Sequence, residues 1–199
     1  MKKIIVALLL CASFGYGQES FESYYNPLAD VKYQIEVEHP DKKGNYTFLI
    51  ECKSIDSRSK NGALIINNKQ LLDFKEHLSY LRDIFIKWKK TAEENKVTDI
   101  NKEIEYKNKF YNSAFTYGDW HFDFNTKLTS YFKYVANKYY VVIYSPKLTS
   151  SSNQFIKSDG YMLSFSSPED FDDLINKLDE TKVIEYYKEK DKKEDLFKN

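Results

Sequence analysis

Cysteine is almost absent from this chain of 199 residues, which holds only Cys11 and Cys52. Cys11 lies in an N-terminal segment that we expect to be removed, so the mature protein keeps one thiol and can form no internal disulfide. Cys52 ends a stretch in which every second residue is apolar, namely Tyr46, Phe48 and Ile50. Because this pattern places the thiol on the apolar face of a strand, we predict a buried cysteine rather than a reactive one.

Long hydrophobic runs are also missing, so we expect no transmembrane segment in the mature chain. The apolar run at residues 4–10 is too short to cross a membrane, follows Lys2 and Lys3, and precedes a Gly-Tyr-Gly sequence. This order predicts a secretory signal peptide over residues 1–17 and export by a bacterium to the periplasm or the medium. A lipid anchor at Cys11 is the alternative, but a bulky leucine stands where lipoprotein processing requires a small residue.

An excess of charge of either sign is lacking as well. The chain carries 30 Lys and Arg against 30 Asp and Glu, and loss of Lys2 and Lys3 leaves 28 against 30, a net charge of −2. Nucleic-acid binders obtain much of their affinity by neutralising phosphates, so we expect no nucleic-acid partner. The 17 tyrosines would suit a binding surface. As the cause of this high tyrosine content we favour a coding preference for codons rich in A and T, which would enrich Tyr, Lys, Asn and Ile together.

Alternation of apolar and polar residues indicates strands with one buried face. Residues 31–37 and 46–52 flank a polar turn, which predicts a β-hairpin over residues 31–53. Residues 131–135 and 139–144 predict a second hairpin in the same way. Further strands are expected at residues 63–66, 120–124 and 161–165.

Two segments have the spacing of amphipathic helices. The first helix is expected to begin at a cap formed by Asn67 or Asn68. Leu72 and Ile84 are expected to flank its apolar stripe. Ser167 begins the second, because a proline and two acidic residues follow it. The stripes consist of Leu71, Phe74, Leu78, Leu81, Phe85 and Trp88 in the first helix and of Phe171, Leu174, Ile175 and Leu178 in the second.

The remaining segments show no clear periodicity. We expect residues 18–30 to be an extended lead-in, residues 97–114 a weakly structured connector and residues 184–199 a solvated charged tail. The sequence therefore predicts a single α+β domain over residues 31–183. Its antiparallel sheet would be built from two hairpins plus further strands, with two amphipathic helices packed on one face.

Motifs that would identify an enzyme are missing, including a nucleophile elbow, a His-Glu-x-x-His pair and a phosphate-binding glycine loop. Three histidines are present, His39, His77 and His121. His77 follows Asp73 by four residues, a spacing typical of a solvent-exposed contact on a helix. We therefore do not place His77 in a site.

One segment does gather candidate ligands. Asp119, His121 and Asp123 would lie on one side of a strand and could form a metal or acid–base site. The same residues suit a solvated face opposite Trp120 and its apolar neighbours. Asp119 and Asp123 would also be about 13 Å apart along a flat strand, too far to share an ion. We therefore predict no metal and no cofactor, and keep Trp120, His121 and Asp123 as candidate binding residues.

The sequence favours a non-enzymatic binding or interaction protein of the cell envelope, either inhibitor-like or a scaffold. A non-enzymatic role is favoured because an enzyme should bring titratable groups together and none are evident, and the expected partner is a protein of the envelope. A small secreted hydrolase or metal-dependent enzyme that uses Asp119, His121 and Asp123 is the alternative. Oligomeric state is left open.

Overall fold

The computed structural model describes residues 20–56, 61–107 and 109–196. These residues form a ten-stranded antiparallel sheet, a separate two-stranded ribbon and three helices, so the predicted α+β class is confirmed. The strands of the sheet are β1 (Glu22–Asn26), β2 (Val31–Val37), β3 (Thr47–Ser54), β4 (Asn61–Asn67), β5 (Asn101–Ile104), β6 (Phe110–Tyr117), β7 (Asp119–Lys127), β8 (Thr129–Val135), β9 (Lys138–Tyr144) and β12 (Tyr161–Phe165). The ribbon consists of β10 (Leu148–Thr149) and β11 (Lys157–Ser158), and the helices are α2 (Asn68–Glu94), α3 (Pro168–Lys177) and α4 (Glu180–Asp195). Within the described residues, no helix is both long and apolar enough to span a membrane.

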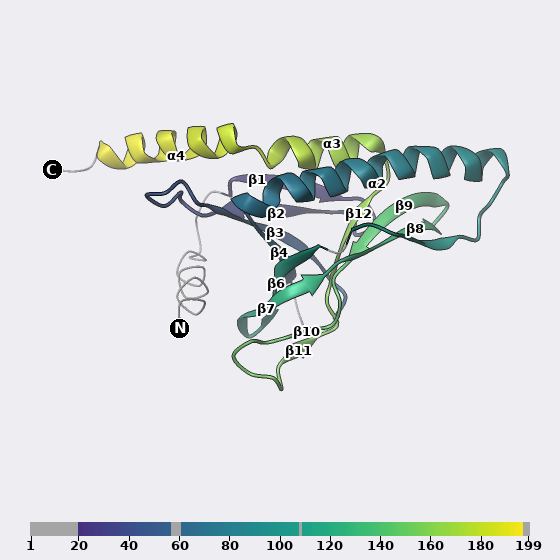
Figure 1. Cartoon of the computed structure of the whole chain (residues 1–199), viewed down its shortest axis with the longest axis horizontal. Helices are drawn as coiled ribbons and strands as arrows, with labels where there is room; N and C mark the ends of the chain where they lie inside the picture. The colour runs from purple at the N-terminus through teal and green to yellow at the C-terminus, as the bar shows by residue number, and fades with distance from the viewer. Residues whose placement is uncertain (1–19, 57–60, 108, 197–199) are drawn as a thin grey trace.

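The sheet runs in the order β5-β8-β9-β12-β3-β4-β6-β7 and divides at β3. One end of β3 pairs with β12, while its other end pairs with β2, where Ile50 lies opposite Ile35. Both predicted hairpins are confirmed, because β2 pairs with β3 and β8 pairs with β9. Figure 1 shows α2 and α3 side by side along one side of the sheet, with the β10–β11 ribbon projecting from the other end of the molecule.

Local sequence signals account for where α2 and α3 begin. Asn67 and Ser167 each accept a backbone hydrogen bond in a capping box, as predicted. The expected apolar stripe of α2 is buried from Leu71 to Phe85, although Leu72 is 69% exposed and does not flank it.

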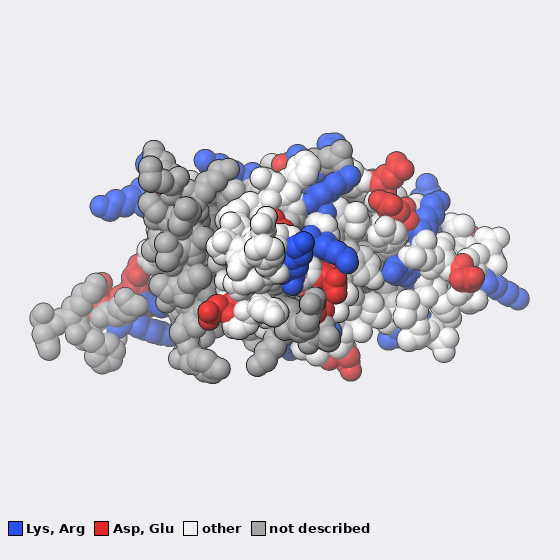
Figure 2. Space-filling model, turned by 90° about the horizontal axis from the view of Figure 1, so that it is seen from below, with Lys and Arg blue, Asp and Glu red and all other residues white. Residues whose placement is uncertain are grey.

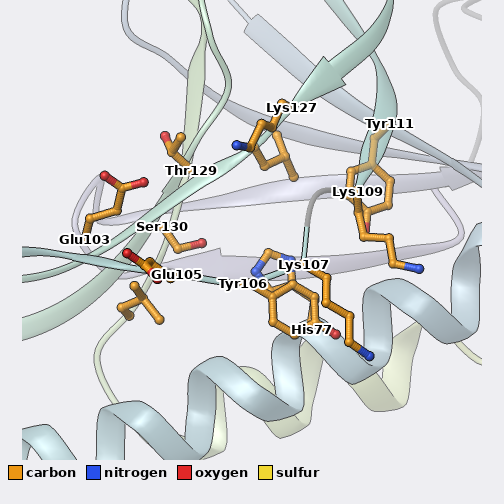
Figure 3. A pocket seen from close by; sticks show the side chains of 12 residues that line it. His77, Glu103, Glu105, Tyr106, Lys107, Lys109, Tyr111, Lys127, Thr129 and Ser130 are labelled. Carbon is orange, nitrogen blue, oxygen red and sulfur yellow. The ribbon is translucent and has the colours of Figure 1, made fainter.

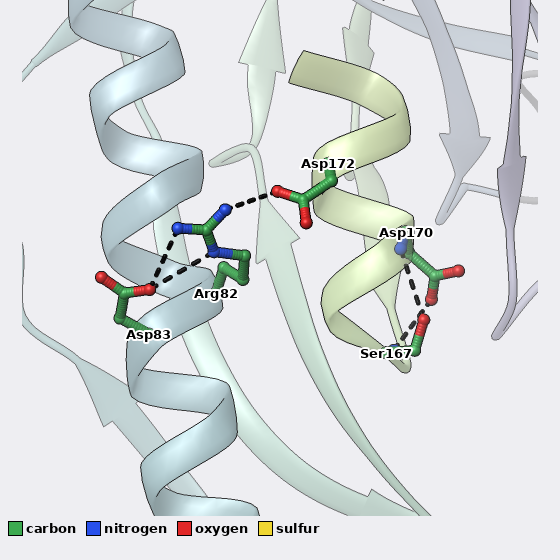
Figure 4. A network of polar contacts seen from close by, with 5 residues as sticks. All are labelled: Arg82, Asp83, Ser167, Asp170 and Asp172. Atoms are coloured by element: carbon green, nitrogen blue, oxygen red, sulfur yellow. Dashed lines mark hydrogen bonds and ion pairs between the residues drawn. The ribbon is translucent and has the colours of Figure 1, made fainter. Parts of the chain in front are cut away.

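Between the helices, Arg82 of α2 donates to the carboxylate of Asp172 at 2.5 Å (Figure 4). The two helices are therefore joined by an ion pair as well as by apolar packing.

Alternate residues of the sheet point to opposite faces and form two apolar clusters. The larger cluster joins the sheet to the helices and contains Phe48, Ile50 and the fully buried Cys52, whose pKa is raised by burial. The predicted burial of this thiol is confirmed. The smaller cluster uses the intervening residues, Leu49, Ala63, Ile65, Ala114 and Phe122, with Trp120 and Phe124 packed against it.

Three segments that we expected to lack regular secondary structure form strands or a helix instead. The expected lead-in contains β1, which pairs with β2 through residues such as Tyr24 opposite Tyr33. The expected connector contains β5 and the start of β6. The expected solvated tail forms most of α4, in which Tyr187 is buried and its hydroxyl donates to the carbonyl of Val37. β5 pairs with β8 and α4 contacts Val37, both distant in the sequence, so local periodicity does not report these two segments, whereas β1 pairs with the adjacent β2.

Candidate functional site

A pocket of about 330 Å³ lies between α2 and strands from both ends of the strand order, β5 and β8 at one end and β6 and β7 at the other. Its lining comes from α2, from β5 and the segment that follows it, from the start of β6, and from the corner between β7 and β8. Two strand pairings build the walls, since β5 places Ile104 opposite Ser130 and β6 places Tyr111 opposite Thr126. Figure 3 shows His77 rising from α2 with Tyr111 and Ser130 on separate strands around the same space.

His77 is 4% exposed, so the expectation of a solvated contact with Asp73 is wrong. Its ring stacks on Tyr106, with centroids 4.3 Å apart and an angle of 5° between the rings. Asp73 instead accepts a hydrogen bond from the ammonium of Lys109 at 2.8 Å. Burial lowers the pKa of His77 to about 4, so the imidazole is neutral at pH 7. A neutral imidazole presents one donor nitrogen and one acceptor nitrogen.

Tyr111 and Ser130 are equally buried, at 2% and 3% exposure. The Tyr111 ring meets Phe74 edge-on at 5.6 Å, and burial raises the pKa of its hydroxyl. In the part of the chain that the structure describes, neither the Tyr111 hydroxyl nor the Ser130 hydroxyl has a hydrogen-bond partner, and neither nitrogen of His77 has one. Of five such buried side-chain atoms among the described residues, these four belong to three residues that line one pocket. Buried polar groups are bonded in the great majority of cases, so this concentration of unpaired groups marks the pocket as the candidate site.

Charged side chains lie around this pocket and not within it. Glu103, Glu105, Lys107 and Lys127 are exposed, while Lys109 is held by its ion pair with Asp73. The interior surface is completed by the buried apolar residues Ile104 and Leu128. The site therefore combines an uncharged, hydrogen-bonding interior with a charged rim.

The residues that the sequence singled out lie elsewhere and do not converge. His121 contacts the hydroxyl of Ser150 at 3.2 Å and the carbonyl of Tyr117 at 3.3 Å. Asp123 accepts a hydrogen bond from the backbone amide of Thr149 at 2.7 Å. These two side chains are partly exposed and hold the segment around β10 against β7. Asp119 is exposed beyond them, and Trp120 packs on the opposite face against the smaller cluster.

A metal site is not assembled from these residues. Among the residues that the structure describes, no three His, Cys, Asp or Glu side chains are placed to hold an ion. The engagement of His121 and Asp123 with the β10 segment gives both side chains a structural role.

Comparison of the chain with protein-family models, with curated proteins and with solved structures produced no match. The pocket therefore has to be interpreted from its own chemistry. The sequence did contain one signal for it, because His77 lies three residues after Phe74 and four before Leu81, on the apolar side of α2. Tyr111 fell in the expected connector and Ser130 preceded the expected hairpin, so neither carried a comparable signal.

Proposed function

We propose that this protein is an exported bacterial binding protein that encloses a small polar ligand between α2 and strands β5 to β8. The observation that carries the proposal is the group of unpaired polar atoms on His77, Tyr111 and Ser130, all on one pocket. An unsatisfied buried polar group costs about 1–3 kcal/mol, so a ligand that bonds to all three residues would recover a substantial free energy. The pocket volume of about 330 Å³ lies at the lower end of the range for small-molecule sites.

Binding fits the geometry better than catalysis does. A general base works best when its pKa is near the operating pH, whereas burial holds the pKa of His77 near 4. Activation of a serine also requires a hydrogen bond to its base, and Ser130 makes no such bond to His77. A hydrolase or metal enzyme centred on Asp119, His121 and Asp123 receives no support from the contacts of these residues.

Native mass spectrometry of the protein isolated from its own envelope tests the proposal. We expect a bound small molecule in the mature protein and its loss in a Tyr111→Phe, Ser130→Ala double variant. Tyr161→Phe is the matched control, because the Tyr161 hydroxyl is also buried but bonds to Ser113 within the protein. Retention of the same molecule by the double variant, or a mature protein without any bound molecule, would overturn the proposal.

Export is part of the proposal, and it rests on residues 1–17 of the sequence, which lie outside the described residues. The intact mass of the exported protein should correspond to a chain that begins at Gln18, with or without cyclisation to pyroglutamate. A mass that begins at Cys11 with attached lipid would instead indicate a membrane anchor. On the face seen in Figure 2, basic and acidic side chains are interspersed, which agrees with the proposal that nucleic acid is not the partner.

A protein partner is a second candidate, favoured by the loop between β10 and β11. Phe155 in this loop is 84% exposed, and the ribbon projects away from the helices (Figure 1). An exposed aromatic side chain on a projection suits insertion into the surface of an envelope protein. A pull-down from envelope extract should then recover a partner with the wild-type protein and lose it with Phe155→Ser. Equal recovery with both proteins would exclude this loop as the contact.

A further inference from the structure

We infer that the ligand of the pocket is an uncharged, polyhydroxylated molecule of monosaccharide size, whose hydroxyl groups bond to His77, Tyr111 and Ser130. This inference rests on the proposed function and specifies the chemistry of the same site. It follows from three properties of the pocket: the absence of charge from its interior, the dual bonding capacity of its polar groups, and its size.

The first property is the position of charge. The four freely exposed charged side chains of the lining, Glu103, Glu105, Lys107 and Lys127, belong to the rim, and Lys109 is already neutralised by Asp73. Beneath them, the described lining is formed by neutral polar and apolar groups. Burying an ion without a buried partner of opposite charge is strongly unfavourable. The part of the ligand that reaches His77, Tyr111 and Ser130 is therefore uncharged.

The second property is the kind of hydrogen bond that each group can form. A neutral imidazole offers one donor and one acceptor, and the tyrosine and serine hydroxyls can each donate and accept. A carboxylate or phosphate only accepts, so it would leave the acceptor nitrogen of His77 unpaired. An ammonium only donates, so it would leave the donor nitrogen unpaired. Hydroxyl groups donate and accept, and can satisfy all four unpaired atoms.

The third property is size and the nature of the walls. A cavity of about 330 Å³ has the volume of roughly eleven liquid water molecules, which leaves enough room for one hexose. Ile104 and Leu128 present buried apolar surface to the same space. Such surface suits the C–H groups of a sugar ring, which alternate with its hydroxyls. A pyranose therefore fits within the pocket and suits it in hydrogen bonding and in apolar contact.

Isothermal titration with a matched set of sugars tests this inference on the mature protein. The probes are neutral glucose, galactose, mannose and N-acetylglucosamine, anionic glucuronate, and cationic glucosamine. We expect at least one neutral sugar to bind at least tenfold more tightly than both charged sugars. Tyr111→Phe and Ser130→Ala should each weaken that binding at least fivefold, whereas Tyr161→Phe should leave it unchanged. Circular dichroism and thermal unfolding establish that each variant is folded.

The outcomes separate this inference from the proposed function. Tighter binding of glucuronate, lost in Lys127→Gln, would show that the rim governs recognition and would overturn the inference while the pocket remains a binding site. The inference also fails if none of the sugars binds but native mass spectrometry finds another molecule that depends on Tyr111 and Ser130. If no sugar binds and the native protein contains no bound molecule, both proposals fail.

Discussion

Two groups of buried polar side chains lie on the helix-facing side of the same sheet, and they differ in one respect. In the first, the hydroxyl of Ser113 bonds to Thr126 at 2.6 Å and to Tyr161 at 2.8 Å, so the protein satisfies its own polar groups. In the second, the hydroxyl of Tyr111, two residues earlier on the same strand, has no hydrogen-bond partner within the described part of the chain. The first group is satisfied within the fold, and we propose that the second bonds to another molecule. Burial alone therefore does not distinguish structural polar groups from functional ones, whereas the pairing of each atom does.

The largest expected effect concerns the packed side of α2, which the pocket adjoins. Leu78 directly follows His77 but is fully buried in the main apolar cluster. Leu78→Ala should lower the free energy of unfolding by roughly 2–5 kcal/mol, because a large side chain is removed from a packed core. Lys87→Ala on the exposed side should change it by less than about 0.5 kcal/mol. Equal denaturant midpoints for the two variants would show that the buried face of α2 is wrongly assigned.

The next effect is the pH dependence that His77 imposes. Its pKa is about 4 in the folded state and about 6.5 when exposed, so the unfolded chain binds more protons between these values. Stability therefore falls as the pH drops from 6.5 to 4, by about 3 kcal/mol from this residue, and the loss is complete below the folded-state pKa. Urea unfolding at several pH values, compared between wild type and His77→Gln, measures this contribution.

The contributions of other titrating groups to stability are the same in wild type and in His77→Gln, so they cancel when the two proteins are compared. Burial, and secondarily the charge of Glu51, raises the pKa of Glu36 to about 7, which makes stability rise as the pH falls toward 4.5. This contribution has the opposite sign to that of His77 but is the same in wild type and variant. A constant difference between the two proteins from pH 7 to pH 4 would mean that His77 is not buried as a neutral ring.

The comparison between the paired and unpaired groups is tested directly by two matched substitutions. Tyr161→Phe removes a hydrogen bond to Ser113 and should cost about 1–2 kcal/mol. Tyr111→Phe removes a hydroxyl that bonds to none of the described residues, so it should be neutral or stabilising within about 0.5 kcal/mol. Chemical unfolding of the ligand-free proteins gives both values. An equal decrease in the free energy of unfolding for the two variants would show that the paired and unpaired hydroxyls do not differ.

The smallest effect is expected at the residues that the sequence singled out. His121→Ala removes two long contacts of a partly exposed ring, to Ser150 and to the Tyr117 carbonyl, and should cost less than about 1 kcal/mol. Binding in the pocket should not change, and metal analysis should find no stoichiometric ion in either protein. A tightly held ion that is lost in His121→Ala would restore the metal-enzyme hypothesis.

The elements that could be predicted are those whose signal is local. Alternation in residues 31–37 and 46–52 identified a hairpin because side chains on a strand point to opposite faces in turn. The caps at Asn67 and Ser167 identified two helix starts because each side chain bonds to a backbone amide within the first turn. β5 escaped prediction because Ile104 is its only buried residue. α4 escaped it because Tyr187 is buried by contacts with a distant part of the chain, including Val37.

The sequence by itself determined the secondary structure of the two hairpins and of α2 and α3, and the burial of Cys52, because each depends on neighbours a few residues apart. Only the tertiary structure decided which polar side chains lack partners. His77, Tyr111 and Ser130 are far apart in the sequence, and they share a pocket because β5 pairs with β8 and β6 pairs with β7 beside α2. Likewise, the order of residues in β7 placed His121 and Asp123 on one face, but the position of β10 decided that they hold a loop. A hydrogen bond depends on distance in space, which sequence spacing does not determine for residues on different elements.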